Sequence, residues 1–119
     1  MRNDKDNPIL DKSMDFSVRI VKLNQYLSNE KKEYVMSRQL LRSGTSIGAN
    51  AHEAHNAQSE KDFIAKMHVA LKEATETEYW LNLFVRTNYL TNKKFLSIVK
   101  DCVELKRILT AIIKTMKSK

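Results

Sequence analysis

The residues best suited to a binding chemistry are basic side chains near the end of the chain. Four of them recur every seven residues and a fifth follows within one turn: Lys93, Lys100, Arg107, Lys114 and Lys117. A seven-residue period keeps side chains on one face of a helix, with a drift of only about 20° per heptad. Cations held on one face can neutralise several phosphates of a nucleic acid. The pattern therefore predicts a nucleic-acid-binding surface, to which Arg38 and Arg42 contribute from an earlier segment.

The overall charge also favours an acidic partner. The chain has 21 lysines and arginines against 14 aspartates and glutamates, a formal net charge of +7 at pH 7. Residues 89–119 hold eight bases and two acids, so this segment alone carries +6. A solvated helix face is the alternative, because Glu104 lies within pairing distance of both Lys100 and Arg107 on a helix. Charge alone does not decide between the two interpretations.

The three histidines do not have the spacing of a metal site. His52 and His55 are three residues apart, whereas the zinc-protease pattern His-Glu-x-x-His places its histidines four apart. His68 lies in another segment, and the sequence offers no second cluster of ligands. The single cysteine, Cys102, falls in an apolar stripe, which predicts a buried thiol. We expect no metal and no cofactor.

The sequence lacks the residues that catalysis requires. Acids and polar residues of the middle segments could be interpreted as paired catalytic groups: Asn50, Glu53, Glu73, Glu76, Thr77 and Glu78. No nucleophile lies beside a base, and no glycine-rich phosphate loop or carboxylate-rich metal motif is present. These groups are better suited to hydrogen bonds between helices that fix the register of packing. The sequence predicts no catalytic residue and no enzyme.

Four helical segments position these side chains. Apolar residues recur at steps of three and four in four stretches, which are 8–27, 33–56, 60–88 and 92–117. Long helices joined by short polar connections predict an all-α, antiparallel up-down-up-down four-helix bundle. We expect residues 1–7 to form a flexible tail before a single domain at 8–119.

Three of the helix starts have recognisable signals. Asn7 precedes Pro8, which suits the first helical position because its missing N–H costs nothing there. Ser59 stands three residues before Asp62, and Thr91 precedes the last helix. The second helix has no such signal, so its start near residue 33 is left without a cap.

Two glycines in the second helix predict a close contact. Gly44 and Gly48 are the only glycines of the chain, and an interior glycine costs a helix roughly 0.5–1 kcal/mol relative to alanine. An antiparallel hairpin of the second and third helices would place Gly48 near Ala70 and Gly44 near Ala74. We expect these two strips of small residues to pack tightly against each other.

The apolar faces of the first and third helices differ in width. The first helix is predicted to have a wide apolar face, in which one stripe at steps of four, four and three runs beside a second stripe: Leu10, Met14, Val18 and Val21, with Phe16, Ile20, Leu23 and Leu27 alongside. The end of the third helix is apolar over roughly 240°, more than one bundle core requires. Tyr79, Trp80 and Leu83 lie in that arc. We expect these three to form an interface between subunits.

The location follows from what the sequence lacks. No apolar run approaches the roughly 18 residues that cross a bilayer, and the first residues lead into no signal-peptide segment. We expect a cytoplasmic protein with no membrane partner.

The middle of the chain resembles a known family. The stretch LLRSGTSIGAN at 40–50 is followed by further matching motifs, which are EA at 53–54, AQS at 57–59, KDFI at 61–64, ALKEA at 70–74, ET at 76–77 and YWL at 79–81. This pattern resembles the four-helix-bundle proteins encoded in intervening sequences of bacterial large-subunit ribosomal RNA genes. The accessory variability determinant of diversity-generating retroelements is similar to the same family. Ala51-His52 departs from the family, which commonly has isoleucine followed by alanine there.

The resemblance implies more than the residues alone do. It implies a homopentameric barrel of up-down-up-down bundles and, in the retroelement relatives, a basic surface that engages nucleic acid and a reverse transcriptase. It supplies no catalytic residue. Our leading hypothesis is a non-enzymatic, oligomeric bundle that binds RNA or DNA through its basic face. The alternative is a protein-interaction or assembly module whose charge serves only solubility.

Overall fold

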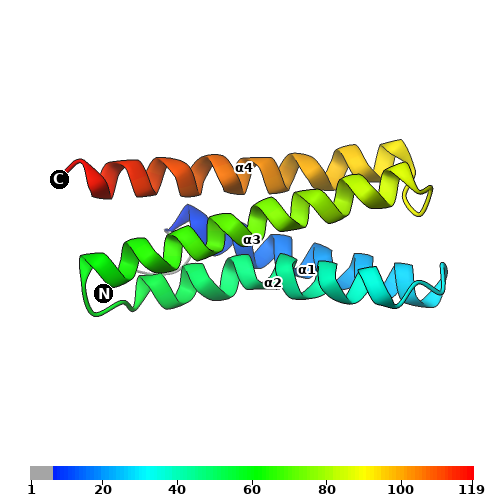
Figure 1. Cartoon of the computed structure of the whole chain (residues 1–119), viewed down its shortest axis with the longest axis horizontal. Helices are drawn as coiled ribbons and strands as arrows, with labels where there is room; N and C mark the ends of the chain where they lie inside the picture. The colour runs from blue at the N-terminus through cyan, green and yellow to red at the C-terminus, as the bar shows by residue number, and fades with distance from the viewer. Residues whose placement is uncertain (1–6) are drawn as a thin grey trace.

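The computed structural model describes residues 7–119, in which four helices and no strand occur. The helices are α1 (Pro8–Asn29), α2 (Val35–His55), α3 (Glu60–Arg86) and α4 (Asn92–Lys117). They pack as an all-α four-helix bundle 46 × 23 × 22 Å in extent (Figure 1). The expected flexible tail falls, apart from Asn7, outside the described residues. None of the helices within 7–119 is long and apolar enough to cross a membrane.

Each helix contacts the next along the chain, and α1 also contacts α4. Helices α2 and α3 run in opposite directions, because Ser43 faces Thr77 and Glu53 faces Lys66. The contact between α1 and α4 is less extensive than the other three, and two ion pairs bridge it. Figure 1 shows α4 and α2 on opposite sides of the bundle, with no direct contact between them.

Side chains cap two helices as the sequence predicts. The Ser59 hydroxyl accepts a hydrogen bond from the backbone N–H of Asp62 at 3.0 Å, and the Thr91 hydroxyl accepts one from Lys94 at 3.2 Å. Both caps are confirmed. Asn7 occupies the corresponding position before Pro8 at the start of α1, but its side chain makes no capping hydrogen bond.

Helix α2 is capped by a residue that the sequence analysis did not identify. It begins at Val35 rather than at 33, because the Glu33 carboxylate accepts hydrogen bonds from the N–H groups of the first turn. One carboxylate oxygen accepts hydrogen bonds from the N–H groups of Val35 and Met36, both at 3.2 Å, and the other accepts from Ser37 at 2.7 Å. Three of the four N–H groups that a helix start leaves unpaired are thereby satisfied by a negative charge. The residue is buried, with 9% of its surface exposed.

Replacing Glu33 with alanine should lower the free energy of unfolding by about 1–2 kcal/mol, the cost of losing a helix cap. Glu33→Gln keeps one carbonyl oxygen for the same N–H groups and should lose less. Urea unfolding followed by circular dichroism measures both variants. Equal stability of the alanine variant and the parent would show that the cap contributes nothing.

Two residues in left-handed conformation set the helix ends. Lys32 has φ 55° and Asn88 has φ 68°, a region that asparagine enters more readily than lysine. After α3 the N–H of Tyr89 returns to the carbonyl of Phe84 at 2.9 Å, which ends the helix at Arg86 rather than at residue 88. Helix α1 instead continues two residues beyond the expected residue 27, to Asn29.

The buried face of α1 is narrower than the predicted one. Met14, Val18 and Val21 are 53%, 48% and 39% exposed, so the prediction that they enter the core is wrong. The part of the predicted face that contains Phe16 and Ile20 is buried, with both residues at most 2% exposed. Helix α1 carries two apolar stripes, and the contacts with α2 and α4 bury the other one. Met14, Val18 and Val21 form an exposed apolar stripe on the surface.

The glycine strip packs against α1 instead of α3. A Cβ added to Gly44 would lie 2.7–2.9 Å from three side-chain carbons of Ile20, and one added to Gly48 would lie 3.3 Å from Ser13. Both neighbours are on α1, so the expected contact of the glycines with the Ala70 and Ala74 strip is wrong. The two alanines are fully buried, and the Ala74 carbonyl accepts a hydrogen bond from the Cys102 thiol of α4. Close packing is observed, but with a different partner.

Candidate nucleic-acid interface

The five basic residues predicted on α4 all lie on its solvent side. Lys93, Lys100, Arg107, Lys114 and Lys117 are exposed, and we call them the outer basic face. The opposite side of the helix enters the core through Ile98, Cys102, Leu105, Leu109 and Ile113. Burial of that side fixes the rotation of α4, so the heptad of bases must point outward.

The acids of α4 do not neutralise this face. Glu104 pairs with Lys12 of α1 at 3.3 Å, rather than with Lys100 or Arg107, and Asp101 pairs with Arg19 at 2.7 Å. Within residues 7–119, none of the five residues of the outer basic face makes an ion pair. Their charges therefore remain available to an acidic partner.

The sequence analysis missed the two α1 bases that take up these acids. Lys12 and Arg19 are seven residues apart, the same period as the bases of α4, and both point toward α4. Arg19 also donates to the backbone carbonyl of Ser97 at 3.1 Å and to its hydroxyl at 2.9 Å. Two bases seven residues apart in the first helix, and the acids Asp101 and Glu104 three residues apart in the last helix, could have predicted this contact from the sequence.

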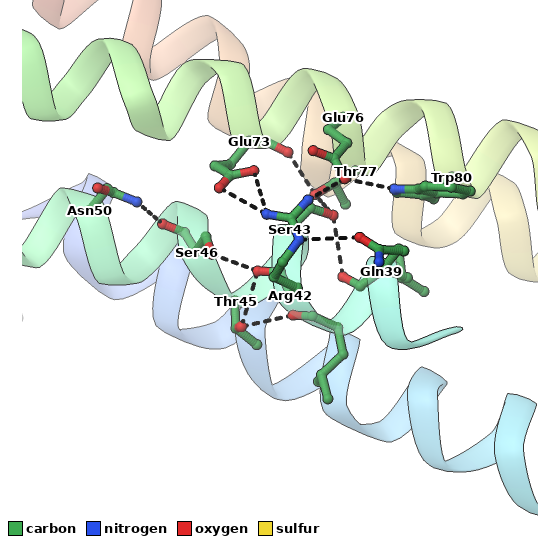
Figure 2. A network of polar contacts seen from close by, with 12 residues as sticks. Gln39, Arg42, Ser43, Thr45, Ser46, Asn50, Glu73, Glu76, Thr77 and Trp80 are labelled. Carbon is green, nitrogen blue, oxygen red and sulfur yellow. Dashed lines mark hydrogen bonds and ion pairs between the residues drawn. The ribbon is translucent and has the colours of Figure 1, made fainter. Parts of the chain in front are cut away.

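The two arginines of α2 occupy different environments. Arg38 is exposed, whereas Arg42 forms ion pairs with Glu73, at 3.2 Å, and with Glu76 (Figure 2). The hydrogen bond from Arg42 lowers the pKa of the Glu76 carboxyl, and the same bond raises the pKa of Arg42. One cation thus faces two acids. Arg42 belongs to an inter-helix network, and neither arginine joins the outer basic face because α2 and α4 are not in contact.

One of the two aromatic residues near the end of α3 forms a hydrogen bond within the bundle. The indole N–H of Trp80 donates to Glu76 at 2.9 Å, and Figure 2 shows the ring beside the Arg42 network. Tyr79 packs edge-on against Trp80 with ring centroids 5.1 Å apart, yet 59% of its surface is exposed. Leu83 is half-buried. The predicted interface residues therefore present an apolar surface to solvent.

The polar residues of the 40–50 stretch are used within the bundle. Ser46 donates to the carbonyl of Arg42 at 2.6 Å, and Asn50 donates to the carbonyl of Ser46 at 2.8 Å. Thr77 donates to the hydroxyl of Ser43, which links α2 to α3 at 3.0 Å. Figure 2 shows these bonds lying along α2, where they face its own backbone or α3. This stretch has an architectural role.

One of the three histidines bonds within its own helix. His52 Nδ1 lies 2.7 Å from the carbonyl oxygen of Gly48, a contact within one turn of α2. Over residues 7–119, no three histidine, cysteine, aspartate or glutamate side chains come together in a way that could hold a metal ion.

Comparison with known proteins identifies the family. The model of the 23S rRNA-intervening sequence proteins matches residues 5–111. The chain belongs to this family. It is also similar to a crystal structure of a protein of unknown function from the S23 ribosomal protein family of Bacteroides thetaiotaomicron. That protein shares 58% sequence identity and a TM-score of 0.90, over 92% of this chain and 98% of its own. No curated protein matches.

Membership in the 23S rRNA-intervening sequence protein family confirms the resemblance drawn from the 40–50 stretch. Neither the family description nor that of the crystal structure names an enzymatic activity. In this family member the glycines of the stretch lie in the α1–α2 contact, and its hydroxyl groups bond to helix backbones and to α3. The residues of this stretch thus serve the packing of the bundle, while the outer basic face lies on α4.

Proposed function

We propose that this protein is a non-enzymatic, nucleic-acid-binding protein that contacts RNA through the outer basic face of α4. The contacts are directed mainly at phosphates, since the face presents lysine and arginine side chains, whose positive charges attract the backbone of a strand whatever its sequence. RNA is preferred over DNA because the family takes its name from an intervening sequence of a ribosomal RNA.

One observation supports this proposal above the others. Five exposed bases follow one face of a 26-residue helix, and no acid among residues 7–119 pairs with them. The acids of the same helix are turned toward α1, where they are paired. A face needed only for solubility has no reason to exclude acids so consistently, because mixed charges serve solubility equally well.

The test measures RNA affinity at two salt concentrations for the parent and for a variant with Lys100, Arg107 and Lys114 replaced by glutamine. The parent should bind more weakly at higher salt. For single-stranded RNA, a plot of the logarithm of the affinity against the logarithm of the salt concentration should have a slope of roughly −0.7 per phosphate contact. Loss of three contacts should make the slope less steep by about 2.

A charge-matched variant controls for net charge. Lys61, Lys72 and Arg86 are exposed on α3 and make no ion pair among the described residues, so replacing them with glutamine removes the same three charges elsewhere. We expect this variant to bind nearly as the parent does. If both variants lose affinity equally, binding depends on overall charge and the outer basic face is not the site.

We also propose that the up-down-up-down bundle assembles into a homo-oligomer, a pentamer by family resemblance. The opposite directions of neighbouring helices support the topology. The exposed Tyr79 and the half-buried Leu83 support an interface on α3, since a monomer gains nothing from apolar surface there. An oligomer would also bring several copies of the outer basic face together.

Light scattering tests the α3 interface. A Tyr79→Ser, Leu83→Ser variant should have a lower molar mass than the parent while retaining a helical spectrum. Met14→Ser, Val18→Ser is the matched control, because it removes the same kind of exposed apolar surface from α1. A drop in molar mass in the α1 variant alone would move the interface to the exposed apolar stripe of α1.

A second candidate function rests on the same apolar surface of α3. In this alternative the protein is an interaction or assembly module for another protein, such as a reverse transcriptase, and its charge serves only solubility. It predicts RNA binding that is weak, insensitive to salt and equal in the parent and the α4 variant. In both candidates we place the protein in the cytoplasm.

A further inference from the structure

A pocket with a volume of about 700 Å³ lies between the second half of α1 and the first turns of α4. Its apolar lining comes from Leu23 of α1, Leu90 of the α3–α4 turn and Ile98 of α4. We call it the α1–α4 pocket. Its volume is within the range of about 300–1,000 Å³ typical of sites for small molecules. It lies where the contact between α1 and α4 is sparse.

The pocket is strongly cationic. Four bases line it from both helices, namely Arg19, Lys22, Lys93 and Lys94, and no acid lines it. Arg19 alone of the four is in an ion pair within residues 7–119, with Asp101. The three lysines are exposed and carry uncompensated charge around an apolar floor. This combination suits a ligand that has an anionic group and an apolar or planar part.

Two of these lysines lie where a positive charge is unfavourable as long as the pocket holds no anion. Lys93 and Lys94 lie in the first turn of α4, which contains no acid, and the positive end of the helix dipole disfavours cations there. By contrast, the first turn of α3 contains Glu60 and Asp62. An anion in the α1–α4 pocket would relieve the repulsion among the lysines and the helix end.

An aromatic ring forms part of the same wall. Tyr26 lines the pocket, and the Lys94 ammonium lies 3.7 Å from the centre of its ring. This cation–π contact holds Lys94 at the pocket rather than in free solvent. The Ser97 hydroxyl, which accepts a hydrogen bond from Arg19, lies in the lining as a further polar group.

We propose that the α1–α4 pocket binds a single nucleotide. Lys22, Lys93 and Lys94 hold its phosphate, and the base lies on the apolar floor beside Leu23 and Leu90. This site shares Lys93 with the outer basic face but goes beyond it. The outer basic face would follow successive phosphates of a strand, whereas a pocket of this size admits one nucleotide unit. A free nucleotide and the 5′-terminal nucleotide of an RNA present the same chemistry, and the test separates them.

The primary test is a calorimetric titration of the full chain with AMP. The parent should bind AMP saturably and more tightly than either inorganic phosphate or adenosine. A Lys22→Gln, Lys94→Gln variant should bind AMP about tenfold more weakly or worse, as expected for the loss of charge-assisted hydrogen bonds. The control, Lys61→Gln, Lys72→Gln, removes the same charge from α3, outside both the pocket and the outer basic face, and should leave AMP affinity unchanged.

The source of the nucleotide is identified by competition. If the ligand is an RNA end, a 5′-phosphorylated RNA should displace AMP while the same RNA without its 5′-phosphate should not. If the ligand is a free nucleotide, neither RNA should displace AMP. Both results support the pocket.

Equal loss of AMP affinity in the two variants, adenosine binding as tight as AMP, or no saturable binding would each overturn the proposal. Because the pocket variant spares Lys100, Arg107 and Lys114, failure at the pocket is distinguishable from failure of RNA binding on the outer basic face.

Discussion

A Gly44→Leu substitution is expected to lower the free energy of unfolding by about 3 kcal/mol or more, the upper part of the range for overpacked cores. Even the first atom of the new side chain, Cβ, would lie within 2.9 Å of three carbons of Ile20. Ile20 has no exposed surface, so its side chain has no free space into which it can move. Chemical unfolding at fixed protein concentration measures the loss.

A double-mutant cycle assigns the effect to Ile20. Gly44→Ala adds only Cβ and should still destabilise the parent, although alanine favours a helix over glycine by about 1 kcal/mol. In an Ile20→Ala background the three clashing carbons are absent, so Gly44→Ala should become neutral or stabilising. If Gly44→Ala is equally destabilising in both backgrounds, the close approach of α2 to α1 is not the reason for the glycine.

The thiol of Cys102 should react with an aromatic disulfide reagent about a thousandfold more slowly in the folded protein than in the unfolded chain at pH 8. Burial raises the pKa of Cys102 from its ordinary value of 9.0 to about 12, and the reactive species is the thiolate. Three pKa units correspond to about a thousandfold smaller thiolate fraction. Reaction at the unfolded rate without denaturant would contradict the packing of α4 against α3.

The same shift predicts a dependence of stability on pH. Because the folded protein retains the thiol proton up to about pH 12 while the unfolded chain releases it near pH 9, ionisation favours unfolding between these values. The contribution of Cys102 to stability is therefore complete below about pH 9 and is lost as pH rises toward 12. A Cys102→Ala chain, compared with the parent over this range, should lack this part of the alkaline loss.

Local features of the fold could be predicted from the sequence because they depend on few residues. Ser59 and Thr91 cap α3 and α4, since a hydroxyl beside the first turn needs no distant partner. Glu33 escaped prediction because it caps α2 from outside the usual position and with an unusual residue type. Its role depends on the left-handed Lys32 and the chain path that it sets.

Features that depend on the choice of a neighbour were harder to predict. A stripe of small residues on α2 fits closely against any helix, so the sequence did not distinguish α1 from α3 as the partner of Gly44. Helix α1 carries two apolar stripes, and periodicity alone did not show that the one containing Met14 faces solvent. Likewise, Arg42 was assigned to a basic surface because its acidic partners are more than thirty residues away in sequence.

The outer basic face was predictable because it depends on one helix alone. Once α4 buries its apolar side, the heptad of bases must lie opposite, and the structure places all five residues in solvent. The absence of ion pairs on this face was not predictable, because it depends on α1, where Lys12 pairs with Glu104 and Arg19 pairs with Asp101. Whether the face binds nucleic acid stays a prediction.

The most direct test of that prediction is lysine footprinting by mass spectrometry, with and without RNA, on the unmodified sequence. Lys100 and Lys114 should be protected from acetylation by RNA, whereas Lys61 and Lys72, which are also exposed but lie on α3, should react as before. The four residues serve as internal controls for one another in a single sample. Equal protection on both helices, or protection on α3 alone, would contradict the assignment of nucleic-acid binding to α4.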